Sequence, residues 1–305
     1  MAAALVATAP TLYFARELIN DTKAEIEAGR LHLAQLVATQ ADRLLTEAFF
    51  ELELLVESLA IAPDGKPTRS ETQILRTGRS SSFIAGVMLL DSEVEIVLAE
   101  PATAATGTGI DEILKAAALA DDRTVSQPWL DPQTGHVMSA LGLPVYDRTG
   151  GRQATMVALL DLSEPLVTDL IEPAAGLGPS GHADLVDERG LVLASTHPGH
   201  VLTAGDHPDF YTRMAQLRTS SVERVAAIPE PQSLDRSPWH LMAYAPLRNA
   251  PWGVALGANE EETLRTVWRL QHRLIVLGLA ASATLLLGAG LAMFQVPDRS
   301  SEERP

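Results

Sequence analysis

The chain has 305 residues, of which 46% are hydrophobic, so it is long and apolar enough for more than one folded domain. Its formal net charge is −16, and lysine occurs only at Lys23, Lys66 and Lys115. No nucleic-acid partner is expected, because phosphate binding depends on clustered Lys and Arg. The absence of cysteine excludes disulfides, thiolate metal ligands and cysteine nucleophiles.

Residues 1–15 form an apolar N-terminal segment without a charge. Fifteen helical residues cover about 22 Å, which is less than the ~30 Å hydrocarbon core of a bilayer. The segment lacks the basic start of a signal peptide and contains Pro10. Two interpretations stay open: the remnant of a first membrane helix, or the apolar start of the helix that follows.

Residues 16–60 are predicted to form one long helix that runs as a spine beside more than one module. Apolar residues recur there at the three- and four-residue spacing of one helix face. Three further apolar residues, Leu45, Phe49 and Val56, widen this stripe and are expected to be available to a partner chain. The stripe itself consists of Leu33, Leu36, Leu44, Ala48, Leu52, Leu55 and Leu59.

Residues 61–172 are predicted to form a first, membrane-distal module rich in strands. Apolar β-compatible runs alternate there with polar turns, of which the turn from Tyr146 to Gly151 is the clearest. The expected strands are 83–90, 95–98, 137–145 and 155–162, and the expected helices are 111–120 and 166–171.

Residues 173–258 repeat this order as a second, membrane-proximal module. A connecting helix over 259–273 follows, and it begins with Asn259 and Glu262 at the spacing of a capping box. The expected strands are 183–186, 191–195, 222–227, 241–245 and 253–256, with a helix over 209–217.

The run from Leu274 to Phe294 has no charged residue, and Arg273 and Asp298 lie on either side of it. Twenty-one helical residues span roughly the ~30 Å hydrocarbon core, so we expect a C-terminal transmembrane helix. The short tail 295–305 cannot hold a kinase, cyclase or chemotaxis signalling domain. The output module is therefore expected on another chain, or it is missing from this one. The predicted fold class is α/β (α+β): a long N-terminal helix, two tandem PAS-like modules and one membrane helix.

This order of elements resembles the double Cache family of bacterial extracytoplasmic sensors. The resemblance covers most of residues 11–294 and depends on the order and spacing of three stretches rather than on a single motif. The first stretch comprises Trp129–Gly135, Leu143–Asp147, Gly150–Gly151 and Leu159–Leu162, the second Gly181–Gly190 and Leu193–Pro198, and the third Ala243–Leu247 and Pro251–Val254.

The resemblance implies that the distal module binds a small organic ligand and that the proximal module couples it to the membrane helix. Asp161 matches the last-strand Asp of relatives that bind amino acids or amines, and Trp129 stands where an aromatic residue falls. The Arg-x-Trp-Tyr stretch of those relatives is absent, and Asp111–Leu114 lies in its neighbourhood. The candidate ligand-binding residues are Asp161, Trp129, Asp131 and Tyr146.

Each of the two main candidates has a structural alternative. Asp161 lies in an apolar strand, where an unpaired carboxylate is costly, so it either meets a ligand or donor or turns to solvent at the strand end. Trp129 either stacks on a ligand or fills the core.

Other chemistry has weaker support. The G-x-G-x-x-G pattern from Gly176 to Gly181 follows a helix and opens a strand, the reverse of a dinucleotide site. His197, His200 and His207 share a Pro- and Gly-rich loop with Asp206, without the fixed frame that zinc requires. We therefore expect no metal, no cofactor and, without a nucleophile and base at matching positions, no enzymatic activity.

The sequence thus favours a membrane-anchored sensor, and the alternative is a tail-anchored scaffold or interaction protein that binds no ligand. Three arginines precede the membrane run and two follow it, which slightly favours a cytoplasmic domain. The family resemblance favours the reverse, so the large domain is expected outside the cytoplasmic membrane. A homodimer is expected from small residues on one face of the membrane helix: Gly278, Ser282, Leu285, Ala289 and Ala292.

Overall fold

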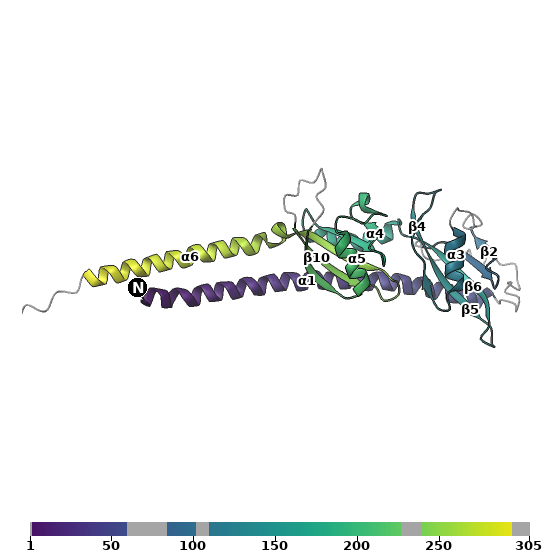
Figure 1. Cartoon of the computed structure of the whole chain (residues 1–305), viewed down its shortest axis with the longest axis horizontal. Helices are drawn as coiled ribbons and strands as arrows, with labels where there is room; N and C mark the ends of the chain where they lie inside the picture. Colours follow the sequence, from purple (N-terminus) through teal and green to yellow (C-terminus); the bar gives the residue numbers. More distant parts are fainter. Residues whose placement is uncertain (1, 60–83, 102–109, 227–238, 295–305) are drawn as a thin grey trace, which may run out of the picture. The chain divides into compact units, whose positions relative to one another are not determined.

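A computed structural model of the chain describes residues 2–59, 84–101, 110–226 and 239–294. The chain divides into two compact units: one comprises residues 30–260, and the other comprises residues 1–29 with 261–305. Two long helices contribute to both units, α1 (Ala2–Leu59) at the start and α6 (Glu260–Phe294) at the end (Figure 1). The apolar segment 1–15 is therefore helical from Ala2 onward.

The first sheet of the 30–260 unit is antiparallel and has six strands in the order β2-β1-β6-β5-β3, with β4 also pairing with β5. The long strands β5 and β6 form a hairpin around the turn that begins after Tyr146. The strands are β1 (Ile84–Asp91), β2 (Ile96–Glu100), β3 (Thr124–Val125), β4 (Trp129–Leu130), β5 (Val137–Tyr146) and β6 (Arg152–Asp161).

The second sheet repeats this topology with five antiparallel strands in the order β8-β7-β11-β10-β9. In both sheets the first hairpin pairs through its first strand with the last strand of the module. The strands are β7 (His182–Val186), β8 (Val192–Ser195), β9 (Ser221–Ala226), β10 (Trp239–Pro246) and β11 (Gly253–Asn259). The expected two-module α+β architecture is confirmed, although Phe83 and Ala227, at the ends of two predicted strands, lie outside the described residues.

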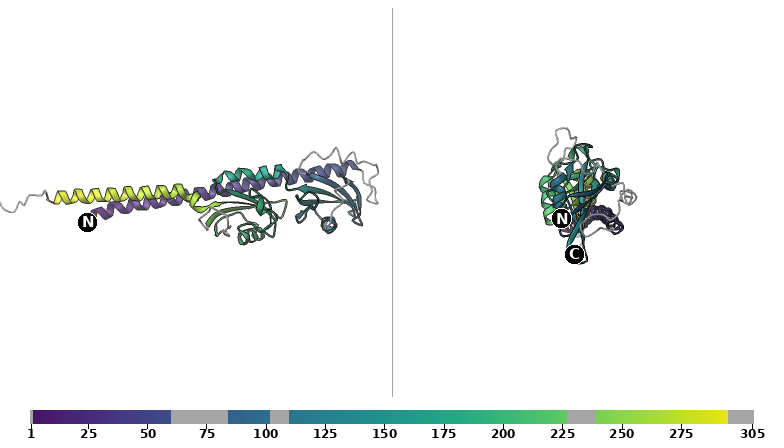
Figure 2. Two further views of the ribbon diagram at one scale, coloured as in Figure 1. Left: turned by 90° about the horizontal axis from the view of Figure 1, so that it is seen from above. Right: turned by 90° about the vertical axis from the view of Figure 1, so that its right-hand side faces the viewer.

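Residues 30–59 of α1 lie along one face of both sheets and build a common core with them (Figure 2). Two short helices, α4 (Pro165–Ile171) and η2 (Glu172–Leu177), connect the two sheets, and Val167 and Ile171 join the same core. The buried line of α1 is rich in alanine, which lets the helix backbone approach the strands closely. It consists of Ala34, Val37, Ala38, Ala41, Leu45, Ala48, Phe49, Leu52 and Leu55.

The expectation that Leu45 and Phe49 serve a partner chain is wrong. Both side chains are almost fully buried in the core, at 2% and 3% exposure. The outward apolar residues are instead Leu36, Phe50 and Leu54, which are 47%, 57% and 49% exposed. The spacing of the leucines does not indicate the centre of the buried face of α1, because the alanines Ala34, Ala38, Ala41 and Ala48 lie there.

Two hydrogen-bonded contacts fix α1 on the second sheet. The buried guanidinium of Arg30 donates from Nη1 to the carbonyl oxygen of Leu241 at 2.9 Å. The Asp42 carboxylate accepts the backbone N–H groups of Arg248 and Asn249 at 2.8–2.9 Å. Bonds to a charged group are stronger than neutral ones, so these contacts set the position of the helix along the strands.

A short helix covers the other face of each sheet. α3 (Ile110–Leu119) packs on β5, where Gly142 leaves room for it: an added Cβ would lie 2.9 Å from the carbonyl oxygen of Ala117. α5 (Pro208–Leu217) buries Phe210, Tyr211 and Met214 on the second sheet. Each module is thus a sheet between α1 and a short helix, the arrangement expected of a PAS-like module.

The unit formed by residues 1–29 and 261–305 is helical in its described part, with Leu264 and Val267 buried near the start of α6. Among the residues that the structure describes, none belongs to a helix that combines the length and the apolar character needed to cross a membrane. The side chains of Ser282, Leu285, Ala289 and Ala292, on the face expected to dimerise, lie outside the described residues.

Candidate functional sites in the two modules

In the first module, a row of side chains crosses three neighbouring strands on the face covered by α3. Asp161 at the end of β6 pairs with Met138 of β5, and Met138 pairs with Trp129 of β4. Directly paired antiparallel residues point to the same face. Trp129 and Met138 also belong to one apolar cluster, together with Val157 and Leu159 of β6. The two main ligand candidates, Asp161 and Trp129, are therefore brought together in one corner.

The carboxylate of Asp161 is 7% exposed and has two partners. His136 Nδ1 lies 2.7 Å from Oδ2, and the backbone N–H of Ser163 donates to Oδ1 at 2.9 Å. The hydrogen bond to Asp161, and next its negative charge, raise the pKa of His136 above the ordinary value of 6.5. His136 stands in the turn before β5, and no sequence pattern distinguishes it from other histidines in turns.

The other two candidates occupy different positions. Asp131 follows β4, but its carboxylate accepts bonds from Gln133 N–H and from the N–H and hydroxyl of Thr134. The bond from the Thr134 hydroxyl is the main cause of its lowered pKa. Tyr146 lies at the opposite end of β5 and donates its hydroxyl to the Asp121 carbonyl oxygen at 2.5 Å. Asp131 thus shapes a turn beside the corner, and Tyr146 lies outside it.

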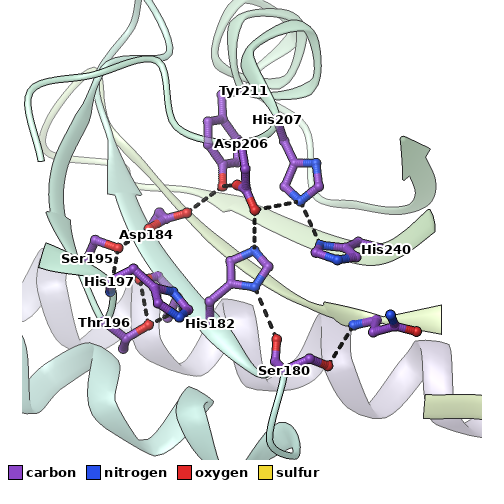
Figure 3. A network of polar contacts seen from close by, with 12 residues as sticks. Ser180, His182, Asp184, Ser195, Thr196, His197, Asp206, His207, Tyr211 and His240 are labelled. Atoms are coloured by element: carbon purple, nitrogen blue, oxygen red, sulfur yellow. Dashed lines mark hydrogen bonds and ion pairs between the residues drawn. The ribbon is translucent and has the colours of Figure 1, made fainter. Parts of the chain in front are cut away.

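In the second module, a cluster of histidines and aspartates occupies the face covered by α5 (Figure 3). His182 comes from β7 and His240 from β10, while Asp206 and His207 come from the loop before α5. The three imidazole rings lie within 4.9–5.6 Å of one another, centre to centre. All three histidines are buried, at 1–7% exposure.

A glycine makes room for the His182 ring. Gly257 of β11 stands between its paired residues His182 and Met242 on the two neighbouring strands. A Cβ at this position would lie 2.6 Å from His182 Nε2, well inside van der Waals contact. The ring therefore lies across the backbone of β11, and it could not do so over any other residue.

A second layer of polar residues supports this cluster. Asp184 accepts the hydroxyl of Ser195 at 2.6 Å and the hydroxyl of Tyr211. The Tyr211 hydroxyl also lies 3.4 Å from Asp206 Oδ1, so it joins the two carboxylates. Burial, followed by these two negative charges, raises the pKa of Tyr211 well above 10. Tyr211 is thus a hydrogen-bond donor at all physiological pH values.

The charges in the cluster are set by burial and by mutual proximity. Burial, against the attraction of Asp206 and with help from the nearby His182 and His240, lowers the pKa of His207 to about 4. Burial disfavours the charge of Asp206, but the surrounding histidines outweigh this and lower its pKa. At neutral pH the cluster therefore combines a neutral His207 with an ionised Asp206.

Sequence spacing grouped the wrong histidines here. Of His197, His200 and His207, only His207 lies in the buried group around Asp206, and His197 is exposed. His182 and His240 were missed because they lie on separate strands, which the sheet order β7-β11-β10 brings to both sides of Gly257. Their positions on one face of predicted strands were the available signal.

No protein-family model and no curated protein sequence matches the chain. Solved structures do match over most of it. The ligand-binding domain of the Pseudomonas aeruginosa amino acid chemoreceptor PctC, in complex with GABA, is 22% identical, with a TM-score of 0.55, over 75% of this chain and 97% of that one.

Two further structures agree with this. The extracellular domain of the putative histidine kinase rpHK1S-Z16 is 16% identical, with a TM-score of 0.61, over 80% of this chain and 97% of that one. The ligand-binding domain of the Pseudomonas fluorescens chemoreceptor CtaA, in complex with L-isoleucine, is 14% identical, with a TM-score of 0.57, over 81% and 98%.

The chain has the double Cache fold that these ligand-binding and extracellular domains share. In this fold the Asp161 corner belongs to the first module, and the histidine cluster belongs to the second module.

Replacing Asp161 by Asn should lower the pKa of His136 towards its ordinary value, because the charged hydrogen-bond partner is lost. A histidine whose pKa is raised on folding contributes stability below the unfolded pKa, and this is lost as the pH rises through the folded pKa. Asp161→Asn should therefore destabilise the protein more at about pH 6 than at about pH 9.

NMR titration of the imidazole signals and urea unfolding at both pH values measure these effects. The exposed His32 on α1 serves as the internal control, and its titration should be the same in both proteins. An unchanged His136 titration in Asp161→Asn would show that the pair does not form.

Proposed function

We propose that the chain is a membrane-anchored extracytoplasmic sensor that binds a small organic ligand in its distal module and signals through the C-terminal helix. Support comes from solved structures of the same fold, which include ligand-binding domains of chemoreceptors in complex with GABA and with L-isoleucine.

The observation that carries this proposal is the buried carboxylate of Asp161 in the same row as Trp129, with Met138 and its apolar cluster between them. Such a corner suits a ligand with an amino group, which replaces the imidazole of His136 on the carboxylate, and an apolar part, which contacts the ring. Residues 60–83 and 102–109 of the same module lie outside the described residues.

The alternative is a scaffold without a ligand, and one observation favours it. Asp161 already has His136 and the Ser163 N–H as partners, so its burial is explained without a bound molecule. The two functions differ in whether a small molecule stabilises the folded protein.

A screen of small amines and amino acids should find a compound that raises the thermal midpoint of the purified chain in detergent. A ligand that binds only the folded state stabilises it by about 2.7 kcal/mol at a hundredfold excess over its dissociation constant. Asp161→Asn should abolish the shift. Asp169→Asn, an exposed Asp on α4, is the matched control and should keep it. A broad screen without any saturable shift supports the scaffold.

Membrane anchoring is part of the same proposal and is supported by the uncharged run from Leu274 to Phe294. Large apolar side chains there point outward along α6. Among the described residues they are Ile275, Val276, Leu277, Leu279 and Leu287, with exposures of 39–69%. Exposed apolar surface of this kind is costly in water and favourable in lipid.

Protease added to intact spheroplasts should digest residues 30–260, because we place this unit outside the cytoplasmic membrane. The chain should remain in the membrane fraction after a high-salt wash, since an inserted helix is not held by charge. A cytoplasmic protein of the same cells serves as the control for intactness. Complete protection of residues 30–260 would show that this unit lies inside the cytoplasmic membrane. Release of the chain by salt would show that no inserted helix anchors it.

A homodimer is also part of the proposal, but the structure changes the surface that we assign to it. Leu36, Phe50 and Leu54 occupy one outward face of α1, where 3.6-residue periodicity places positions 36, 50 and 54 almost in line. In α6, a Cβ added at Gly278 would meet no heavy atom within 4 Å, so this position is open to a second helix.

Replacing Phe50 by Glu should weaken self-association of the purified chain, because the new charge would be buried at the interface. Multi-angle light scattering over a range of concentrations measures the effect. Glu57→Gln, farther along the same helix and exposed, is the control. If Phe50→Glu dimerises as strongly as the parent chain, this face of α1 is not part of the interface. If the parent chain is monomeric, the proposed homodimer is wrong.

A further inference from the structure

The histidine cluster of the proximal module has no role in the proposed distal ligand site. Five of the eight histidines in the chain lie in it, linked ring to ring at 4.9–5.8 Å: His182, His197, His200, His207 and His240. Three of these imidazoles, those of His182, His207 and His240, are buried, so their ring nitrogens need partners.

The backbone fixes the tautomers of two of these rings. His182 Nδ1 lies 3.3 Å from the Ser180 carbonyl oxygen, and His207 Nδ1 lies 3.3 Å from the Ala226 carbonyl oxygen. A carbonyl oxygen can only accept a hydrogen bond, so each Nδ1 carries the proton. In each neutral ring, Nε2 therefore presents its lone pair to the centre of the cluster (Figure 3).

His207 Nε2 can accept a hydrogen bond from His240 Nδ1 at 3.0 Å, but the centre of the cluster still holds an acceptor without a donor. His182 Nε2 is buried and makes no hydrogen bond within the described part of the chain. It faces Oδ2 of Asp206 at 4.0 Å, and the same oxygen lies 3.4 Å from His207 Nε2. Lone pairs that face one another in a buried place are unfavourable unless a positive charge lies between them.

The spacing of these atoms fits a metal ion. His207 Nε2 lies 3.0 Å from His240 Nδ1 and 3.4 Å from Asp206 Oδ2, and that carboxylate oxygen lies 4.0 Å from His182 Nε2. Ligand atoms about 2.0–2.1 Å from a tetrahedral zinc ion are separated by about 3.4 Å. All four candidate ligand atoms lie within 4.8 Å of one another, so small side-chain rotations suffice to bring them to zinc-binding distances.

We propose that the proximal module binds one divalent transition-metal ion through His182 Nε2, His207 Nε2, His240 Nδ1 and the Asp206 carboxylate. Two ligands stand on strands of one sheet, where Gly257 holds the His182 ring in place. The other two directly precede α5, whose Phe210 and Tyr211 are buried in the same module. The strands β7 and β10 thus supply the rigid support for metal ligands that the sequence did not show for the loop histidines.

The surroundings of the four ligands match those of known metal sites. Metal-bound histidines usually donate their second ring N–H to a carbonyl or carboxylate, as His182 and His207 do. The Asp206 carboxylate is contacted in turn by the Tyr211 hydroxyl, which also donates to Asp184. The charge of a divalent ion is thereby offset by Asp206 in contact and by Asp184 behind it.

The donor set indicates which metals fit. Three imidazoles and one carboxylate suit zinc and, after it, cobalt, nickel or copper. Calcium and magnesium prefer six or more oxygen ligands, which these residues do not offer. Zinc requires no particular geometry beyond four close ligands, so it is the first choice.

The test uses the full chain without a polyhistidine tag, purified in detergent, treated with a chelator and then dialysed. Titration with zinc should show one saturable equivalent per chain and a rising thermal midpoint. Cobalt in place of zinc should give the intense visible absorption of a four-coordinate site. The result is independent of the distal ligand, because no amine or amino acid is present.

Variants locate the site. His182→Gln and His207→Gln should bind zinc at least about tenfold more weakly than the parent chain, since each removes one ligand. Asp206→Asn preserves the size of the side chain, and Asp206 is less buried than the histidines. This variant should therefore fold and test the site even if a histidine variant does not fold. Circular dichroism of the metal-free proteins checks folding. His32→Gln on α1 is the matched control and should bind like the parent.

His200→Gln distinguishes this site from a second group in the cluster, formed by Asp184, His200 and Asp206. It should leave zinc affinity within about twofold, well below the effect of losing a ligand. Loss of binding in His200→Gln with unchanged binding in His182→Gln would overturn the assignment. Absence of saturable binding of zinc, cobalt, nickel and copper to the parent chain would overturn the proposal itself.

Discussion

The buried side of α1 is the constraint on which the 30–260 unit depends. Neither sheet encloses a core on that face by itself, and residues 34–55 of the helix fill both. Four of the nine residues in the buried line are alanine, and the larger Leu45, Phe49 and Leu52 stand between and beside them in the same core. Arg30 and Asp42 then hold the helix by hydrogen bonds to backbone groups of the second module. One helix thus determines where two separate sheets stand.

Since α1 occupies one face of each sheet, chemistry is restricted to the other face. In the first module that face carries Asp161, Met138 and Trp129 in a row. In the second module the equivalent face carries His182 and His240 with the loop before α5. The repeated topology therefore presents two separate groups of candidate residues. One has an apolar wall and one carboxylate, and the other is made of imidazoles and carboxylates.

Much of the fold could be predicted from the sequence, because β-compatible runs bounded by Gly, Pro and Asp turns mark the longer strands. The two hairpins that open the modules and the long β5–β6 hairpin were found in this way. The strands β3 and β4 were not predicted, since two residues are too few to show a pattern. The face of α1 was predicted wrongly, since leucine and alanine compete for the buried line and spacing alone does not decide between them. Leu36 is exposed, whereas Ala34 and Ala38 are buried.

The sites were harder to predict, because they depend on contacts between distant segments. Asp161 was a candidate because of the family resemblance, but its partner His136 depends on the register of β5 and β6. His182 and His240 meet only because β11 lies between their strands and has glycine at position 257. Strand order is not encoded in local spacing, so the loop histidines were the only ones that the sequence could group.

Ser180 links the histidine cluster to the end of the last strand. Its carbonyl oxygen holds the ring of His182, and its hydroxyl accepts the backbone N–H of Asn259, the final residue of β11. The chain passes from Asn259 into α6 at Glu260 without a loop residue between them. One serine thus contacts both the buried ring of His182 and Asn259, the residue directly before the C-terminal helix. Because no loop residue lies between Asn259 and Glu260, a shift of Ser180 that moves Asn259 would act directly on the start of α6.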